Sequence, residues 1–147
     1  MKKILIGRVV GILVAVMFLA GLNFLLFSRS VSKREIVQMV EDNVQLLQTY
    51  IDTGDFETNV PLEGVGRASV YQDSETSEAV CILFSCSKST FGRTTTRGFY
   101  YSQDGIFEFG GPPKPDGDGW SWKSDSGQTS YYTENITGNF YYYEHKS

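Results

Sequence analysis

The sequence predicts an α+β protein in which an N-terminal transmembrane helix is followed by one amphipathic helix packed on an antiparallel β-sheet of five to seven strands. Residues 9–27 form an uninterrupted run without charge, and a helix of about nineteen residues spans roughly 28 Å, the thickness of a bilayer's hydrocarbon core. Residues 33–53 carry a helical pattern of apolar positions. From residue 64 onward, short β-rich runs alternate with turn residues.

These patterns divide the chain into four parts. We expect a short N-terminal tail at residues 1–8, the transmembrane helix at 9–27, a linker at 28–32 and a single extracytoplasmic α+β domain at 33–147. The apolar part of a cleaved signal peptide is usually about 7 to 15 residues long. The longer run here favours a retained anchor, and cleavage near Ser30 is the alternative.

Basic residues flank the apolar run in nearly equal number on both sides: Lys2, Lys3 and Arg8 precede it, and Arg29, Lys33 and Arg34 follow it. The positive-inside rule therefore gives little preference. Because long domains translocate largely regardless of their charge, we expect the C-terminal domain to lie outside the cell membrane, held by one span.

The charge of the C-terminal part excludes one class of partner. Residues 31–147 contain all seventeen acidic residues and only nine of the thirteen basic ones, so their formal charge is −8. Nucleic-acid binding requires a basic face that neutralises phosphates. The sequence therefore predicts no nucleic-acid partner, and the only basic cluster comprises Lys88, Arg93 and Arg97.

The two cysteines, Cys81 and Cys86, fall on one predicted strand. Five strand residues span about 16 Å, whereas the Cα atoms of a disulfide lie about 4.4 to 6.8 Å apart. The spacing also differs from that of zinc knuckles. We therefore expect free thiols. Because no metal-binding or nucleotide-binding motif occurs elsewhere in the chain, we also expect no metal site and no cofactor.

The helical region begins with a Ser32-to-Glu35 capping box. Apolar residues then recur every three or four positions, at Ile36, Val40, Val44, Leu47 and Ile51. This spacing predicts one helix over residues 33–53, ended by Gly54 and packed on a sheet. Strands are expected at residues 66–72, 79–86, 94–102, 106–109, 119–123, 128–133 and 138–145, and an irregular Gly- and Pro-rich loop at 110–119.

Aromatic residues are the feature most open to a functional interpretation. They concentrate in the last fifty residues, and neighbours along a strand point to opposite faces, so some reach the surface. We take Trp120, Trp122, Tyr131 and Tyr141 as candidate binding residues for a protein or a cell-surface glycan. The alternative is that these rings form the core.

No catalytic residue is predicted. His145 lies close to the C-terminal end of the sequence, a poor place to orient a catalytic imidazole. The expected function is therefore a membrane-anchored, non-catalytic module for binding, sensing or assembly, whose specific activity the sequence does not reveal. An enzyme of unknown class acting at the cell surface is one alternative.

A second alternative comes from the order of elements. An apolar N-terminal helix that continues into an amphipathic helix and then an antiparallel sheet resembles the plan of type IV pilins. The resemblance implies a self-associating filament subunit. Pilins also carry a glutamate five places after their cleavage point, whereas every acidic residue here follows Ser30.

Overall fold

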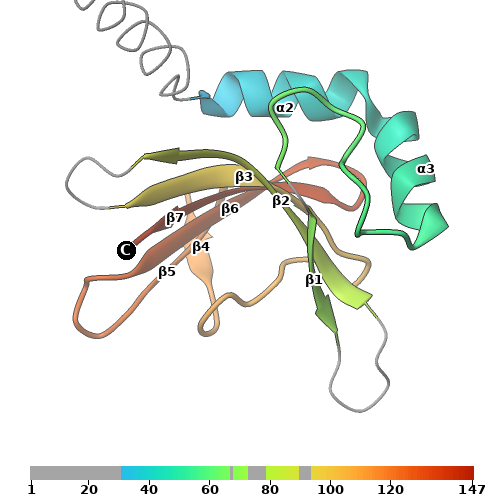
Figure 1. Ribbon diagram of the computed structural model, residues 1–147. Coiled ribbons are helices and arrows are strands. Elements are labelled where there is room, and N and C mark those ends of the chain that lie inside the picture. Colours follow the sequence, from blue (N-terminus) through green and yellow to red (C-terminus); the bar gives the residue numbers. More distant parts are fainter. Residues whose placement is uncertain (1–30, 67, 73–78, 90–93) are drawn as a thin grey trace, which may run out of the picture.

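The computed structural model describes residues 31–66, 68–72, 79–89 and 94–147, which form two short helices packed on a seven-stranded antiparallel sheet (Figure 1). This arrangement confirms the α+β class and a strand number within the expected range. The transmembrane helix expected at residues 9–27 lies outside the described residues. Among the described helices, none combines the length and the apolar character needed to cross a bilayer.

Helix α2 (Lys33–Asp42) begins where the capping box predicts. The Ser32 amide donates to Oε2 of Glu35 at 2.8 Å, and the Glu35 amide donates to the Ser32 hydroxyl at 3.3 Å. Two backbone donors at the helix start are thereby satisfied. Ile36 and Val40 of this helix are fully buried against the sheet.

The prediction of one continuous helix over residues 33–53 is wrong, because the helix breaks at Asn43. Helix α3 (Val44–Thr53) follows at once and runs in a different direction (Figure 1). Asn43 has φ −126° and ψ 19°, and its side-chain amide donates to the Met39 carbonyl at 2.9 Å. Asparagine side chains compete with the helix for backbone groups, which favours a break here. The bend lets Leu47 and Tyr50 also reach the core.

The sheet consists of two meanders, which are joined because the third and seventh strands along the chain pair with each other. The strands are β1 (Ala68–Gln72), β2 (Ala79–Ser89), β3 (Thr95–Tyr101), β4 (Lys114–Asp116), β5 (Gly119–Lys123), β6 (Ser130–Thr137) and β7 (Phe140–Lys146). Their spatial order is β1-β2-β3-β7-β6-β5-β4, with every neighbouring pair antiparallel.

Two strand predictions are wrong. Residues 106–109 form no strand, and Lys114–Asp116, expected within an irregular loop, form β4 at the sheet edge. Pro115 is compatible with this position because an edge strand needs no hydrogen bond from one of its sides. Phe107 and Phe109 instead pack their rings under the sheet, where tertiary contacts replace strand pairing.

Both faces of the sheet are covered. Strand alternation places Phe140 and Tyr142 on the helix side and Tyr141 and Tyr143 on the other. The helices cover the first face, and the segment between β3 and β4 runs beneath the second (Figure 1). Consecutive aromatic residues in β3 and β7 therefore supply two separate cores.

Candidate functional site

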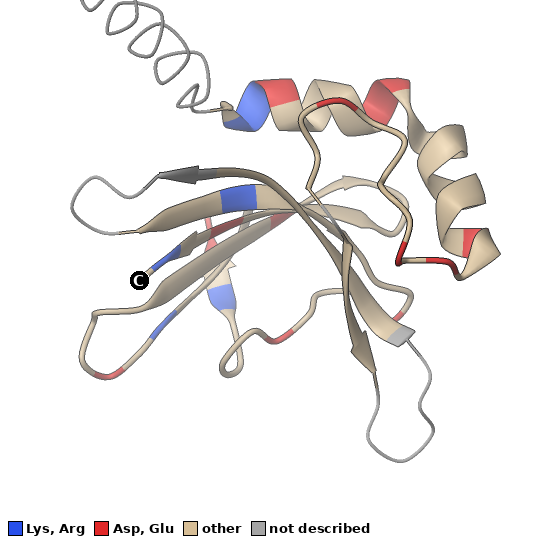
Figure 2. Cartoon of the chain, in the orientation of Figure 1, with Lys and Arg blue, Asp and Glu red and all other residues tan. Residues whose placement is uncertain are grey.

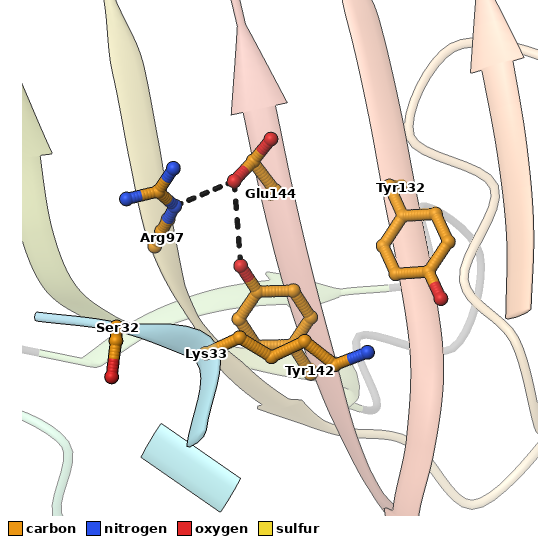
Figure 3. Close-up of a pocket in the computed structure, with 6 residues that line it drawn as sticks. All are labelled: Ser32, Lys33, Arg97, Tyr132, Tyr142 and Glu144. Carbon is orange, nitrogen blue, oxygen red and sulfur yellow. Dashed lines mark hydrogen bonds and ion pairs between the residues drawn. The ribbon is translucent and has the colours of Figure 1, made fainter. Parts of the chain in front are cut away.

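Charged and aromatic side chains gather around a hollow on the helix side, where the start of α2 meets β3, β6 and β7. A cavity of about 290 Å³ is lined there by Ser32, Lys33, Arg97, Tyr132, Tyr142 and Glu144 (Figure 3). A neighbouring hollow of about 320 Å³ shares Tyr132 and Glu144. Its other lining residues are Asp116, Ser121, Lys123, Ser130, Tyr131 and Lys146. We call the two hollows together the groove.

The register of three strands sets the floor of the groove. Arg97 of β3 pairs with Glu144 of β7, and Glu144 pairs with Tyr132 of β6. Directly paired residues point to the same face of a sheet, so the three side chains form a row. Tyr142 pairs with Glu134 in the next row on that face.

Glu144 is held between two cations. It accepts a hydrogen bond from Arg97 Nε at 2.5 Å, and the Tyr142 hydroxyl lies 3.5 Å from its Oε2 (Figure 3). Lys146 Nζ lies 2.6 Å from its Oε1. Burial by itself would raise the pKa of Glu144, but the hydrogen bonds from Lys146 and Arg97 outweigh it, and the net pKa is lowered. The carboxylate is therefore ionised at neutral pH.

Lys33 places its ammonium between two tyrosine rings. Nζ lies 5.5 Å from the ring centroid of Tyr132 and 5.7 Å from that of Tyr142, and it forms an ion pair with Glu134. Both distances are within the range of cation–π attraction. Figure 3 shows the lysine side chain extending past Tyr142 toward Tyr132.

Glu134 supplies the carboxylate that contacts both Lys33 and Tyr132. The Tyr132 hydroxyl donates to its Oε2 at 2.5 Å. Burial opposes ionisation of Glu134, yet the hydrogen bonds from Lys33 and Tyr132 prevail and lower its pKa. Burial and the bond to Glu134 raise the pKa of Tyr132 above its usual value, so the phenol keeps its proton. Glu134 is therefore ionised and Tyr132 is neutral near neutral pH.

The groove thus offers charges of both signs on a scaffold with two tyrosines. Carboxylates with lowered pKa and phenols with raised pKa do not exchange protons near pH 7, which suits binding better than acid–base catalysis. Within the described ranges, no group of three or more His, Cys, Asp and Glu side chains is placed to hold a metal ion.

Charge is unevenly distributed along the domain. Residues 35–66 contain seven acidic residues and no Lys or Arg. Figure 2 shows the described Lys and Arg residues on the first turn of α2 and on the strands below it, away from α3 and the loop that follows. The groove therefore lies at the end of the domain where positive charge is available.

The structure brings two of the four predicted binding residues, Trp122 and Tyr131, into ring contact. Trp120 and Trp122 share one face of β5, as their spacing of two predicts, and the Trp122 ring centroid lies 6.0 Å from that of Tyr131. Tyr131 in turn stacks between Phe109, at 5.1 Å, and His145, at 4.2 Å. Tyr131 also lines the second hollow of the groove.

Tyr141 does not contact this pair. It is only 9% exposed, and its ring stacks on that of Tyr100, with the centroids 5.0 Å apart. Trp122 is covered by the loop before β4. A Cβ atom added to Gly111 would lie 2.4 Å from the indole Nε1, so the glycine backbone sits directly against the ring. The rings of Trp122 and Tyr141 therefore both contribute to packing, and their role in ligand binding stays a prediction.

Sequence reasoning missed most of the groove. Of the predicted basic cluster, Arg97 lines it, whereas Arg93 and the side chain of Lys88 lie outside what the structure describes. Tyr142 and Glu144 lie two positions apart in one predicted strand, so the sequence could have placed both side chains on one face. Lys33 and Arg97 could not have been predicted as their neighbours, because the pairing register between distant segments cannot be read from spacing alone.

The two cysteines are free and lie on opposite faces of β2, with Cys81 in the lower core and Cys86 packed toward the helices. Burial raises the pKa of each thiol to about 12. Neither is a thiolate at neutral pH, so neither has the character of a reactive nucleophile.

The chain matches no protein-family model, no curated protein and no solved structure.

Proposed function

We propose that this chain is a membrane-anchored extracytoplasmic binding module without catalytic activity, and that the groove is its ligand site. The membrane anchor is supported by the apolar run at residues 9–27, and the outer location by the tendency of long domains to translocate. The binding role is supported by one observation above all: two adjoining hollows share Tyr132 and Glu144 and are lined mainly by charged and hydroxyl-bearing side chains.

The charges in the groove favour a ligand that carries charges of both signs. Lys33, Arg97, Lys123 and Lys146 supply positive charge, and Asp116 and Glu144 supply negative charge. Complementary charges give specificity at such sites, and tyrosines combine a large apolar ring with a polar hydroxyl. A glycan that bears peptides with free amino and carboxylate groups, such as a bacterial wall polymer, has this chemistry and is accessible to an anchored outer domain.

The test is cosedimentation of the full chain, in phospholipid nanodiscs, with purified insoluble peptidoglycan. Ser121→Trp introduces a large ring into the second hollow, which Ser121 lines. Ser126→Trp is the matched control, because Ser126 is exposed in the turn between β5 and β6. We expect the wild type and Ser126→Trp to sediment with the polymer and Ser121→Trp to stay in solution.

Sedimentation of Ser121→Trp at the wild-type level would contradict binding in the groove. Circular dichroism of each variant verifies that the sheet is retained. If the wild type does not sediment, the wall polymer is not the ligand. A crosslink formed from position 121 to a protein would then show that the groove binds a protein partner.

A further inference from the structure

We propose that Tyr132, Tyr142 and Glu134 form a receptor for an ammonium group, which Lys33 occupies in the free protein and which the ammonium of a ligand enters by displacing Lys33. We call these three residues the ammonium cage. The inference names the ligand chemistry of the groove and so rests on the proposed function. It assigns Lys33 the role of an internal competitor.

The geometry of the cage is that of a cation site. Two ring centroids lie within 6 Å of one Nζ atom, and a carboxylate oxygen pairs with the same atom. Aromatic faces attract cations through their quadrupole, and the carboxylate supplies the full countercharge. The site therefore already recognises the head group of a primary ammonium.

Lys33 is placed so that it can leave. Its side chain is 45% exposed, in contrast to 22% for Glu134. It lies on the first residue of α2, whereas the fully buried contacts of this helix come from Ile36 and Val40. Moving the lysine side chain into water therefore leaves the helix in position.

The cage keeps its shape when Lys33 leaves. The Tyr132 hydroxyl still donates to Glu134, and Tyr142 remains fixed by its buried position, with 2% of its surface exposed. What remains is a partly buried carboxylate without its cation. Such a group is unfavourable unless another cation replaces the first, which favours entry of an external ammonium.

The cavity gives that ammonium a route. The hollow of about 290 Å³ borders Lys33, Tyr132 and Tyr142, so a ligand lying in it reaches both rings. Because Lys33 belongs to the same chain as the cage, it competes with any external ammonium without a cost of association. Wild-type protein should therefore bind simple ammonium compounds weakly, and removal of Lys33 should increase the affinity.

The experiment is isothermal titration calorimetry of the full chain in nanodiscs with Nα-acetyl-lysine-N-methylamide. The norleucine analogue, which lacks the ammonium, is the neutral probe. We expect Lys33→Ala to bind the lysine probe at least about tenfold more tightly than wild type, and neither form to bind the norleucine probe. Lys33→Ala with Tyr132→Leu should lose the gain because one face of the cage is gone.

Lys114→Ala is the matched control, since it removes an exposed cation of the edge strand that lines neither hollow and leaves the cage intact. An equal gain in Lys114→Ala would mean that the effect is one of net charge and would overturn the inference. Unchanged affinity in Lys33→Ala with a native near-ultraviolet spectrum would also overturn it.

The two proposals can fail separately. If Ser121→Trp abolishes polymer binding while Lys33→Ala has no effect on the lysine probe, the groove binds a ligand and the ammonium cage is wrong. If Lys33→Ala binds the probe while no polymer binds, the cage is right and the proposed function is wrong.

Discussion

Nε of Arg97 donates a 2.5 Å hydrogen bond to Oε2 of Glu144 across the β3–β7 pair, at positions where the two side chains are 29% and 17% exposed. The partners are nearest neighbours in the register. Partial burial reduces screening of the pair by water and salt. Because β3 and β7 belong to different meanders, the bond links the two meanders and holds two side chains of the groove floor in place.

Arg97→Met should reduce the free energy of unfolding by about 1 to 3 kcal/mol, since a bond to a charged partner is lost and a partly buried carboxylate loses one of its cations. Urea denaturation measures this loss. Lys114→Met is the control, because Lys114 is exposed on the edge strand, and its effect should stay within about 0.5 kcal/mol. Equal losses in the two variants would show that the Arg97 bond contributes no specific stability.

Stability should decrease in acid because of Glu134 and Glu144. Their pKa values are lowered in the folded protein, so the folded state binds protons less readily than the unfolded state, in which a glutamate titrates near about 4.3. The stabilisation is complete above this value and is lost as the pH falls through the lower folded pKa values.

Thermal denaturation between pH 7 and pH 3 tests the acid dependence. A double variant, Glu134→Gln with Glu144→Gln, should be less stable at pH 7 and should lose less stability on acidification than the wild type. Parallel pH curves for the two proteins would contradict this origin of acid sensitivity.

A buried chain of hydrogen bonds connects the lower core to the sheet. The Phe107 amide donates to the Tyr100 hydroxyl at 3.3 Å, Tyr100 and Thr133 hydroxyls lie 2.8 Å apart, and Thr133 donates to the Tyr142 carbonyl at 2.9 Å. Because Thr133 uses its proton for Tyr142, Tyr100 must donate to Thr133.

Tyr100→Phe breaks this chain in the middle and leaves the Phe107 amide without its acceptor. We expect a loss of about 1 to 3 kcal/mol, the cost of leaving buried polar groups unpaired. Tyr71→Phe removes a hydroxyl from a residue that is 43% exposed and should be nearly neutral. Guanidinium denaturation compares the two, and a neutral Tyr100→Phe would show that water replaces the missing hydroxyl.

Membrane topology is tested by protease treatment of intact protoplasts. Because residues 9–27 are expected to remain as an anchor with the domain outside, protease should remove residues 33–147 and spare an epitope tag attached before Lys2. Protection of the domain would reverse the orientation. A mature chain that begins near Val31 would replace the anchor by a cleaved signal peptide.

The strongest local signals in the sequence predicted their elements well. The Ser32 capping box marks the start of α2, and the pattern of β5 predicted residues 119–123 with the bounds that the structure has. The break at Asn43 was missed because the apolar spacing continues across it, while the asparagine side chain bonds to the backbone there. The strand at Pro115 was missed because its pairing depends on its position at the edge of the sheet.

The binding residues were harder to predict for a different reason. Trp122 and Tyr131 were chosen as candidates because they are large, aromatic and close in sequence, and their role in binding stays a prediction. The cage joins Lys33 to Tyr132, about a hundred positions later, through the strand register and the placement of α2. Contacts of this kind depend on tertiary structure and leave no periodic pattern.

The measurement that most directly tests the binding role of the groove is an NMR titration of the full chain in nanodiscs with soluble peptidoglycan fragments, using ¹³C-labelled tyrosine rings. We predict that the Tyr132 and Tyr142 resonances shift together and saturate, while Tyr71, on the other face, stays unchanged. Saturable shifts at Tyr71 with unchanged Tyr132 and Tyr142 would contradict the account, as would the absence of any tyrosine shift.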